Sequence, residues 1–166
     1  MAVQAEYAGL AGEFSNAARE HLKDDLIAIC YFGSVARGEA SVESDLDVLV
    51  VADGLPSDLA GRMRTAGVVR EQARKSEAAH SLRRSGRSTM ISSVYMTPKE
   101  VLTHPPILLD IADHGIIEFD KGNFLGNVLE DVRRRLRELG ARKVRAKKGY
   151  YWILKPNRKP MEVIQI

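Results

Sequence analysis

Two aspartates separated by a single leucine are the residues of this chain whose type and spacing point most directly to chemistry. Asp45, Leu46 and Asp47 lie in the run SDLDVLVV. If this run is a strand, the two carboxylates share one face and lie about 6.6 Å apart along it. Such a pair can share divalent metal ions, and a metal pair stabilises the attacking and leaving oxygens of a phosphoryl transfer.

A Gly-Ser dipeptide precedes this pair, with Ser34 eleven residues before Asp45. A Gly-Ser turn that opens a short helix offers backbone N–H groups to a phosphate. Each half alone is common, since Asp-x-Asp also occurs on solvated strand edges and Gly-Ser occurs in ordinary turns. Together, the two halves predict a site for a metal-bound nucleoside triphosphate.

The flanking residues predict where these groups lie. Residues 26–32 form a continuous apolar run, which is typical of a buried strand. The run ends at Gly33, where a close backbone approach costs least, and Ser34 can cap a helical turn over residues 35–38. The Asp-x-Asp run is predicted to be a second strand that turns its carboxylates toward the site and three apolar residues toward a core, namely Leu46, Val48 and Val50.

The order Gly-Ser, ten residues, Asp-x-Asp resembles the signature of the DNA polymerase beta nucleotidyltransferase superfamily. Its extended form, Gly-Ser-x-Ala-Arg-Gly followed by Ser-Asp-x-Asp, is matched by Gly33, Ser34, Ala36, Arg37, Gly38, Ser44, Asp45 and Asp47. The chain is similar to the small stand-alone members called minimal nucleotidyltransferases, of the archaeal type, and a looser similarity extends to residues 150–156. The resemblance implies an α/β fold with a mixed β-sheet flanked by helices.

The resemblance also implies an activity, which is transfer of a nucleoside monophosphate from a nucleoside triphosphate to an acceptor hydroxyl with release of pyrophosphate. Asp45 and Asp47 would hold Mg²⁺ or Mn²⁺, while Gly33 and Ser34 would hold the phosphates. Arg37 would support the site electrostatically or pair with a neighbouring carboxylate, either Glu39 or Glu43. The sequence does not choose among ATP, CTP, GTP and UTP, nor among a small molecule, RNA and protein as acceptor.

Related minimal nucleotidyltransferases act as antitoxins that modify or bind a helical partner toxin. The resemblance therefore leaves a nucleotide-binding regulator with a protein partner as an alternative to an active transferase.

Members of the superfamily usually carry a third carboxylate on the next core strand. The strand expected here, residues 89–96, contains no Asp or Glu, and Ser92 or Ser93 could hold a water in that place. Glu100 could reach back, but Thr-Pro-Lys-Glu is also a common helix start, and we favour Glu100 in a capping box with Thr97 as cap. Further candidates, which the sequence does not rank, are Asp110, Asp113 and Glu118.

The length of the chain predicts one domain. The resemblance implies a nucleotidyltransferase core over residues 1–120, followed by a C-terminal helix and basic hairpin over residues 121–166. The net charge of +3 is uneven, because residues 121–166 hold 13 Lys and Arg against 4 Asp and Glu. Eight basic and no acidic residues occur from 141 to 159, interleaved with aromatic residues at 150–152. Such a tail can bind RNA. The alternative is a hairpin whose aromatic residues cover the end of the core.

The remaining elements are predicted from periodicity and turn residues. Helices are expected over 5–23, 57–79, 107–112 and 125–139, a flexible basic loop over 81–88, a strand over 116–119, and a hairpin of 142–144 with 150–154.

The cysteine and histidine content predicts a cytoplasmic protein with no zinc site, and the distribution of apolar residues predicts no contact with the membrane. The single cysteine, Cys30, is expected in the core, so the chain cannot form an internal disulfide. No hydrophobic signal region or membrane-length apolar run occurs, and the four histidines have no metal-ligand spacing.

Overall fold

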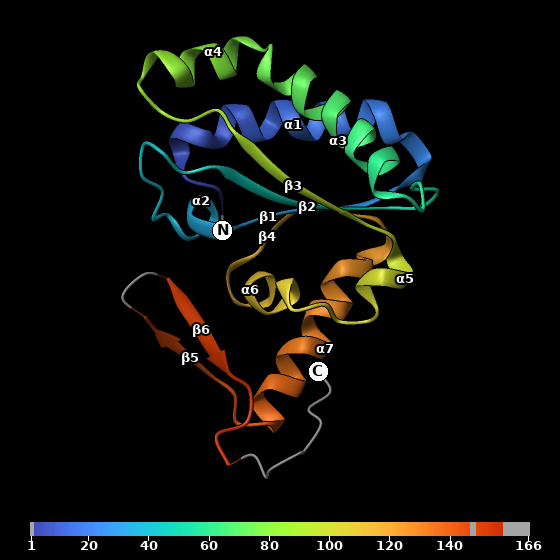
Figure 1. Cartoon of the computed structure of the whole chain (residues 1–166), viewed down its shortest axis with the longest axis vertical. Helices are drawn as coiled ribbons and strands as arrows, with labels where there is room; N and C mark the ends of the chain where they lie inside the picture. The colour runs from blue at the N-terminus through green and yellow to red at the C-terminus, as the bar shows by residue number, and fades with distance from the viewer. Residues whose placement is uncertain (1, 147–148, 158–166) are drawn as a thin grey trace.

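A computed structural model of the chain describes residues 2–146 and 149–157 (Figure 1). Its centre is a four-stranded sheet with the strand order β3-β2-β1-β4. The antiparallel pairs are β1 with β2 and β1 with β4, whereas β3 runs parallel to β2. The strands are β1 (Leu26–Phe32), β2 (Leu46–Ala52), β3 (Ile91–Met96) and β4 (Ile116–Asp120). The predicted mixed sheet is therefore confirmed.

Helices cover both faces of this sheet (Figure 1). One face carries α1 (Ala8–Leu22), α3 (Leu59–Arg74) and α4 (Glu77–Arg84), and the other carries α5 (Pro98–Val101), α6 (Ile107–His114) and α7 (Phe124–Glu138). The short helix α2 (Gly33–Arg37) joins β1 to β2, and 3-10 turns lie at Ala5–Tyr7, Lys23–Asp25 and Lys121–Asn123. The predicted C-terminal hairpin is present as β5 (Arg142–Arg145) and β6 (Tyr150–Ile153).

Alternation along β2 divides the interior into two cores. Three residues, Leu46, Val48 and Val50, pack in a first core with α1 and α3. Leu49 and Val51 point the other way and pack in a second core with α6 and α7, where Cys30 is also buried. Because side chains alternate along a strand, Asp47 lies on the face of Leu49 and Val51, opposite the first core as predicted.

The helix predicted over residues 57–79 is wrong as one continuous element, and the basic loop predicted over 81–88 is confirmed only from residue 85 onward. Helix α3 ends at Arg74 and a separate helix, α4, begins after Ser76, whose hydroxyl accepts a hydrogen bond from the Ala79 N–H at 3.2 Å. This cap satisfies an N–H that would otherwise lack a partner, so a new helix can begin there. Residues 81–84, which were expected in the loop, are the last turn of α4.

The prediction for α7 is confirmed, since its buried face consists of Leu125, Val128, Leu129, Val132 and Leu136. Within the described residues, no helix is long and apolar enough to cross a membrane.

Tyr31 fastens α1 to the sheet, and its removal should measure that attachment. Its buried hydroxyl donates to the Ala11 carbonyl oxygen at 2.5 Å and lies 2.7 Å from Ser15 Oγ. Tyr31→Phe should lower the free energy of unfolding by about 1–3 kcal/mol, because two buried polar groups lose their partner. Urea unfolding followed by circular dichroism measures this. Tyr151→Phe, on an exposed ring, is the matched control, and equal stability of the two variants would contradict the assignment.

Candidate functional site

The sheet register brings the two halves of the predicted site together. Asp47 is the second residue of β2 and pairs with Phe32, the last residue of β1. Gly33 follows Phe32 directly, so the turn lies beside the start of β2. Asp47 is half-buried and Asp45, just before the strand, is exposed.

Gly33 and Asp47 are packed so closely that no side chain fits between them. Gly33 has a φ of +71°, which L side chains rarely adopt, and a Cβ built there would lie 2.9 Å from the Asp47 Cγ and nearer still to its Oδ2. The Asp47 carboxylate therefore lies directly against the backbone that opens α2. A glycine is required here both by the backbone conformation and by this contact.

Helix α2 begins with the two residues of the predicted phosphate turn. Gly33 and Ser34 are its first positions, and their N–H groups have no partner in the preceding turn of a helix. The turn is closed behind them, since the Ser34 carbonyl accepts from the Glu39 N–H at 2.9 Å and Val35 is buried. Backbone N–H groups at the start of a helix can bind a phosphate oxygen.

The electrostatic environment of Asp47 disfavours its charged form. Burial raises the pKa of the Asp47 carboxyl most strongly, and the negative charge of Asp45 raises it further. A hydrogen bond from Ser92 and the charge of Arg37 act in the opposite direction without reversing the shift. The negative charge of these two neighbouring carboxylates is therefore not fully neutralised by the residues around them, which favours binding of a cation.

Arg37 extends from the last position of α2 toward a neighbouring carboxylate, one of the two outcomes the sequence left open. Its Nε lies 2.9 Å from Glu39 Oε2, and its guanidinium carbon lies 6.0 Å from the centre of the Tyr150 ring.

The position of the usual third carboxylate is occupied by a serine. In the parallel pairing of β2 with β3, Ser92 lies opposite Asp47 and donates a hydrogen bond to it. Ser93, the alternative, lies opposite Val48, and its buried hydroxyl has no partner in the described part of the chain. Within residues 2–146 and 149–157, no group of three or more acidic, histidine or cysteine side chains could hold a metal ion.

Glu100, the candidate third carboxylate, lies at the wrong end of the sheet. Strand β3 begins beside Asp47 and runs parallel to β2, so residues after its end at Met96 lie at the far end of both strands. Glu100 instead completes the capping box predicted with Thr97 and forms an ion pair with Arg62 at 2.9 Å. These bonds, chiefly that to Arg62, lower the pKa of Glu100 to about 2.

The other unranked carboxylates are also engaged or placed elsewhere. Lys143 of β5 lies 2.6 Å from Asp113 and 3.8 Å from Asp110, both on α6. Glu118 lies on β4, which β1 separates from β2.

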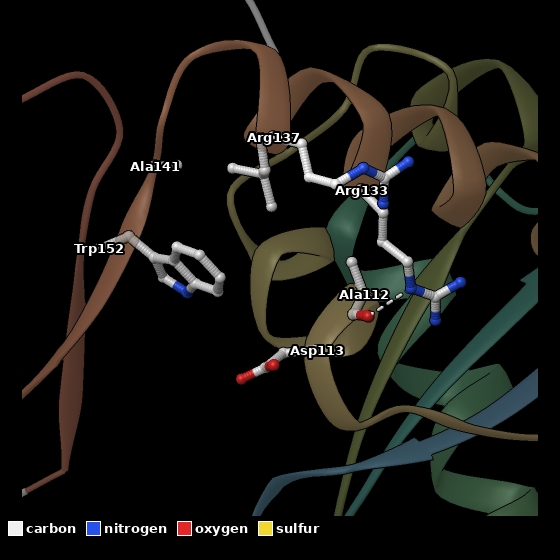
Figure 2. Close-up of a pocket in the computed structure, with 7 residues that line it drawn as sticks. Ala112, Asp113, Arg133, Arg137, Ala141 and Trp152 are labelled. Carbon is white, nitrogen blue, oxygen red and sulfur yellow. Dashed lines mark hydrogen bonds between the residues drawn. The ribbon is translucent and has the colours of Figure 1, made fainter.

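A cavity of about 380 Å³ lies between the hairpin and helices α6 and α7, and neither Asp45 nor Asp47 lines it (Figure 2). Its lining consists of Ala112, Asp113, Arg133, Leu136, Arg137, Ala141 and Trp152. Trp152 packs against the second core, as expected for a hairpin that covers the end of the core, whereas Tyr151 is 51% exposed. The basic residues at 147–148 and 158–159, which belong to the predicted RNA-binding tail, lie outside the described residues.

Comparison with known proteins identifies the family of the chain. A family model described as a nucleotidyltransferase domain matches residues 12–87, which include the Gly-Ser turn and both aspartates. A candidate protein adenylyltransferase of Methanocaldococcus jannaschii is 30% identical over 123 residues, covering 73% of this chain and 77% of that protein. The chain therefore belongs to the nucleotidyltransferase family and is a transferase.

Solved structures of similar fold are more distant. A chain from a toxin–antitoxin complex with AMP-PNP is 16% identical, with a TM-score of 0.47, over 78% of this chain and 91% of that chain. A chain from a tri-AMPylated Shewanella oneidensis HEPN toxin in complex with an MNT antitoxin is 14% identical, with a TM-score of 0.44, over 81% and 92%. At these scores the likeness has no bearing on function.

Replacing Gly33 should separate the effect of its contact with Asp47 from that of backbone strain. Gly33→Ala and Gly38→Ala both force alanine into a positive φ, at +71° and +72°, which costs about 1–2 kcal/mol in each. Only Gly33→Ala also displaces Asp47, because nothing lies within 4 Å of a Cβ at Gly38. We expect Gly33→Ala alone to weaken Mg²⁺-nucleotide binding by at least about tenfold, measured by calorimetry. Equal affinity of the two variants would contradict the role of the contact.

Asp47→Asn should stabilise the folded protein at pH 7. A carboxyl whose folded-state pKa is raised opposes folding once it is charged, so its penalty is present at neutral pH and absent below the unfolded pKa. The gain in the melting temperature should therefore disappear by about pH 3. Thermal unfolding across this range measures it, with Asp53→Asn, at an exposed site just after β2, as control. A loss of stability at pH 7 would contradict the electrostatic account.

Proposed function

We propose that this protein transfers AMP from ATP to a hydroxyl group of another protein in a Mg²⁺-dependent reaction that releases pyrophosphate. The observation that carries the proposal is the placement of Asp47 against Gly33 at the start of the Gly-Ser turn, with the charge of Asp45 beside it. The choice of ATP and of a protein acceptor is supported by the Methanocaldococcus jannaschii relative, whose name describes a candidate protein adenylyltransferase.

The residues present fit a magnesium ion. Mg²⁺ prefers oxygen ligands and is commonly bound by one or two carboxylates together with substrate phosphates. Asp45 and Asp47 supply two such carboxylates. The raised pKa of Asp47, caused chiefly by burial and also by the charge of Asp45, supports a site that a bound cation would stabilise. The bound ion would supply charge neutralisation of the triphosphate and of the developing negative charge.

The chain's own residues would bind and orient the reactants. Gly33 and Ser34 would donate backbone N–H groups to the phosphates, and Arg37 would add positive charge beside them. Ser92 would hold the Asp47 carboxylate in place through its hydrogen bond. Catalysis would consist of positioning and charge neutralisation, with the acceptor hydroxyl attacking the α-phosphorus in line with the leaving pyrophosphate.

A second candidate function is a nucleotide-binding regulator that has lost turnover. Ser92 favours it, because a serine opposite Asp47 cannot accept the proton of the attacking hydroxyl as a third carboxylate would. In this role the protein would bind Mg²⁺-ATP and form a stable complex with a helical, toxin-like partner protein.

The test is pyrophosphate release from each of the four ribonucleoside triphosphates with Mg²⁺, using cellular protein and cellular RNA as separate acceptors. We expect release from ATP with protein, and a loss of at least about 100-fold in the folded Asp45→Asn, Asp47→Asn double variant, since metal stabilisation is worth several kcal/mol.

The other outcomes discriminate between the candidates. Release that depends on RNA would contradict the protein acceptor and support the RNA-binding interpretation of the tail. Nucleotide binding without release from any triphosphate would support the regulator. Release that the double variant retains would contradict the assignment of the site.

A further inference from the structure

The end of the C-terminal hairpin lies against α2, far from it in sequence. Tyr150 and Arg145 face each other across the two strands of the hairpin. The Tyr150 ring lies 6.0 Å from the Arg37 guanidinium carbon. The pKa of Glu39 is lowered chiefly by its hydrogen bond to Arg37, and also by the nearby charge of Arg145. One cross-strand pair of the hairpin therefore lies near the Arg37–Glu39 ion pair, with Tyr150 beside Arg37 and the charge of Arg145 acting on Glu39.

The hairpin is anchored so that this contact has a fixed geometry. The Lys143 side chain, 15% exposed, forms an ion pair with Asp113 of α6 at 2.6 Å. The same ammonium group lies 4.7 Å from the centre of the Tyr150 ring and 5.9 Å from that of Trp152. Trp152 packs against the second core and lines the cavity shown in Figure 2. Lys143 thus connects the Tyr150 and Trp152 rings of β6 to α6, and Arg37 contacts the same Tyr150 ring from α2.

Glu39 would compete with a bound triphosphate for the Arg37 guanidinium. Its Nε is now bonded to Glu39 at 2.9 Å, and this pair reduces the positive charge that a phosphate would meet. If Arg37 turned to a phosphate, Glu39 would lose its partner, and Arg145 is a cation placed to replace it. An aromatic ring interacts with the face of a guanidinium and leaves the N–H groups at its edge free for bonds to phosphate.

We propose that Arg145 and Tyr150 are positioning residues that release Arg37 from Glu39 and direct it toward the triphosphate of the bound nucleotide. The hairpin, which lies outside the residues 12–87 matched by the family model, thereby becomes part of the nucleotide site. The inference rests on the proposed function only in that the ligand is a nucleoside triphosphate. It does not require turnover.

Substitutions of Glu39 and Arg145 should have non-additive effects on the affinity for nucleotide. The probe is Mg²⁺ with the α,β-methylene analogue of ATP, which binds but cannot release pyrophosphate, and affinity is measured by calorimetry. Arg145→Gln should weaken binding about 3- to 10-fold, because Glu39 then keeps Arg37. Glu39→Gln should bind at least as tightly as the wild type, and the double variant should bind as Glu39→Gln does. If Arg145→Gln weakened binding equally in the wild type and in the Glu39→Gln variant, the proposal that Arg145 replaces Arg37 as the partner of Glu39 would be overturned.

Tyr150 is tested by a conservative and a disruptive replacement. Tyr150→Ala should weaken binding of the analogue about 2- to 5-fold, whereas Tyr150→Phe keeps the ring and should match the wild type. Tyr151→Ala is the matched control, because side chains alternate along β6 and this exposed ring lies on the face opposite that of Tyr150. Trp152 is the only tryptophan of the chain, so its emission reports whether the hairpin stays docked in each variant. Equal affinity of Tyr150→Ala and Tyr151→Ala would remove Tyr150 from the proposal.

The assay also separates this proposal from the proposed transfer. If ATP is turned over, Tyr150→Ala and Arg145→Gln should raise the KM for ATP and leave kcat nearly unchanged, because Arg37 binds the triphosphate before the reaction. Absence of transfer together with the predicted non-additivity would refute the proposed function alone. Transfer with no effect of either variant on affinity or KM would refute the positioning role alone.

Discussion

The site depends on one steric constraint, the contact between the Gly33 backbone and the Asp47 carboxylate. It is possible only because glycine lacks a Cβ and because the antiparallel register places Asp47 opposite Phe32. Once β1 and β2 pair in this register, a half-buried carboxylate is fixed against the start of α2, with Asp45 beside it. Partial burial of the Asp47 carboxylate beside the like charge of the exposed Asp45 opposes folding, and a metal ion bound with a nucleoside triphosphate would offset that repulsion. The two carboxylates that lower the stability of the protein without ligand are thus the groups that would bind its metal and substrate.

The parts of this arrangement that the sequence predicted are local. The Gly-Ser turn, the Asp-x-Asp strand and the capping box around Glu100 each lie within a few residues, so spacing alone reports their geometry. The break at Ser76 was missed, although a serine followed by Glu77 is a helix-start pattern, because the arginine-rich run on both sides continues a helical composition. The choice between Ser92 and Ser93 could not be made, since it depends on the register of a parallel pair rather than on either strand.

The second half of the chain contributes to the site through contacts that have no local signature. Helices α6 and α7 build the second core beneath the face that carries Asp47, and the hairpin docks on α6 through Lys143. Its end then reaches Arg37, more than 100 residues earlier in the sequence. From sequence, the basic and aromatic hairpin suggested RNA as readily as packing, because composition does not say which face is turned inward. The structure places Trp152 against the core. Tyr151, between Tyr150 and Trp152 on β6, therefore has its ring on the opposite, exposed face.

The most direct test of the central claim follows the individual phosphates of ATP. The protein is incubated with Mg²⁺, cellular protein and ATP labelled either at the α-phosphate or at the γ-phosphate. The site described here predicts that the α-label becomes covalently attached to protein, while the γ-label leaves entirely as pyrophosphate. Attachment of the γ-label would mean transfer of a phosphoryl group instead, and would contradict the account. Attachment of neither label, with nucleotide bound, would show that the two aspartates hold a ligand that they do not turn over.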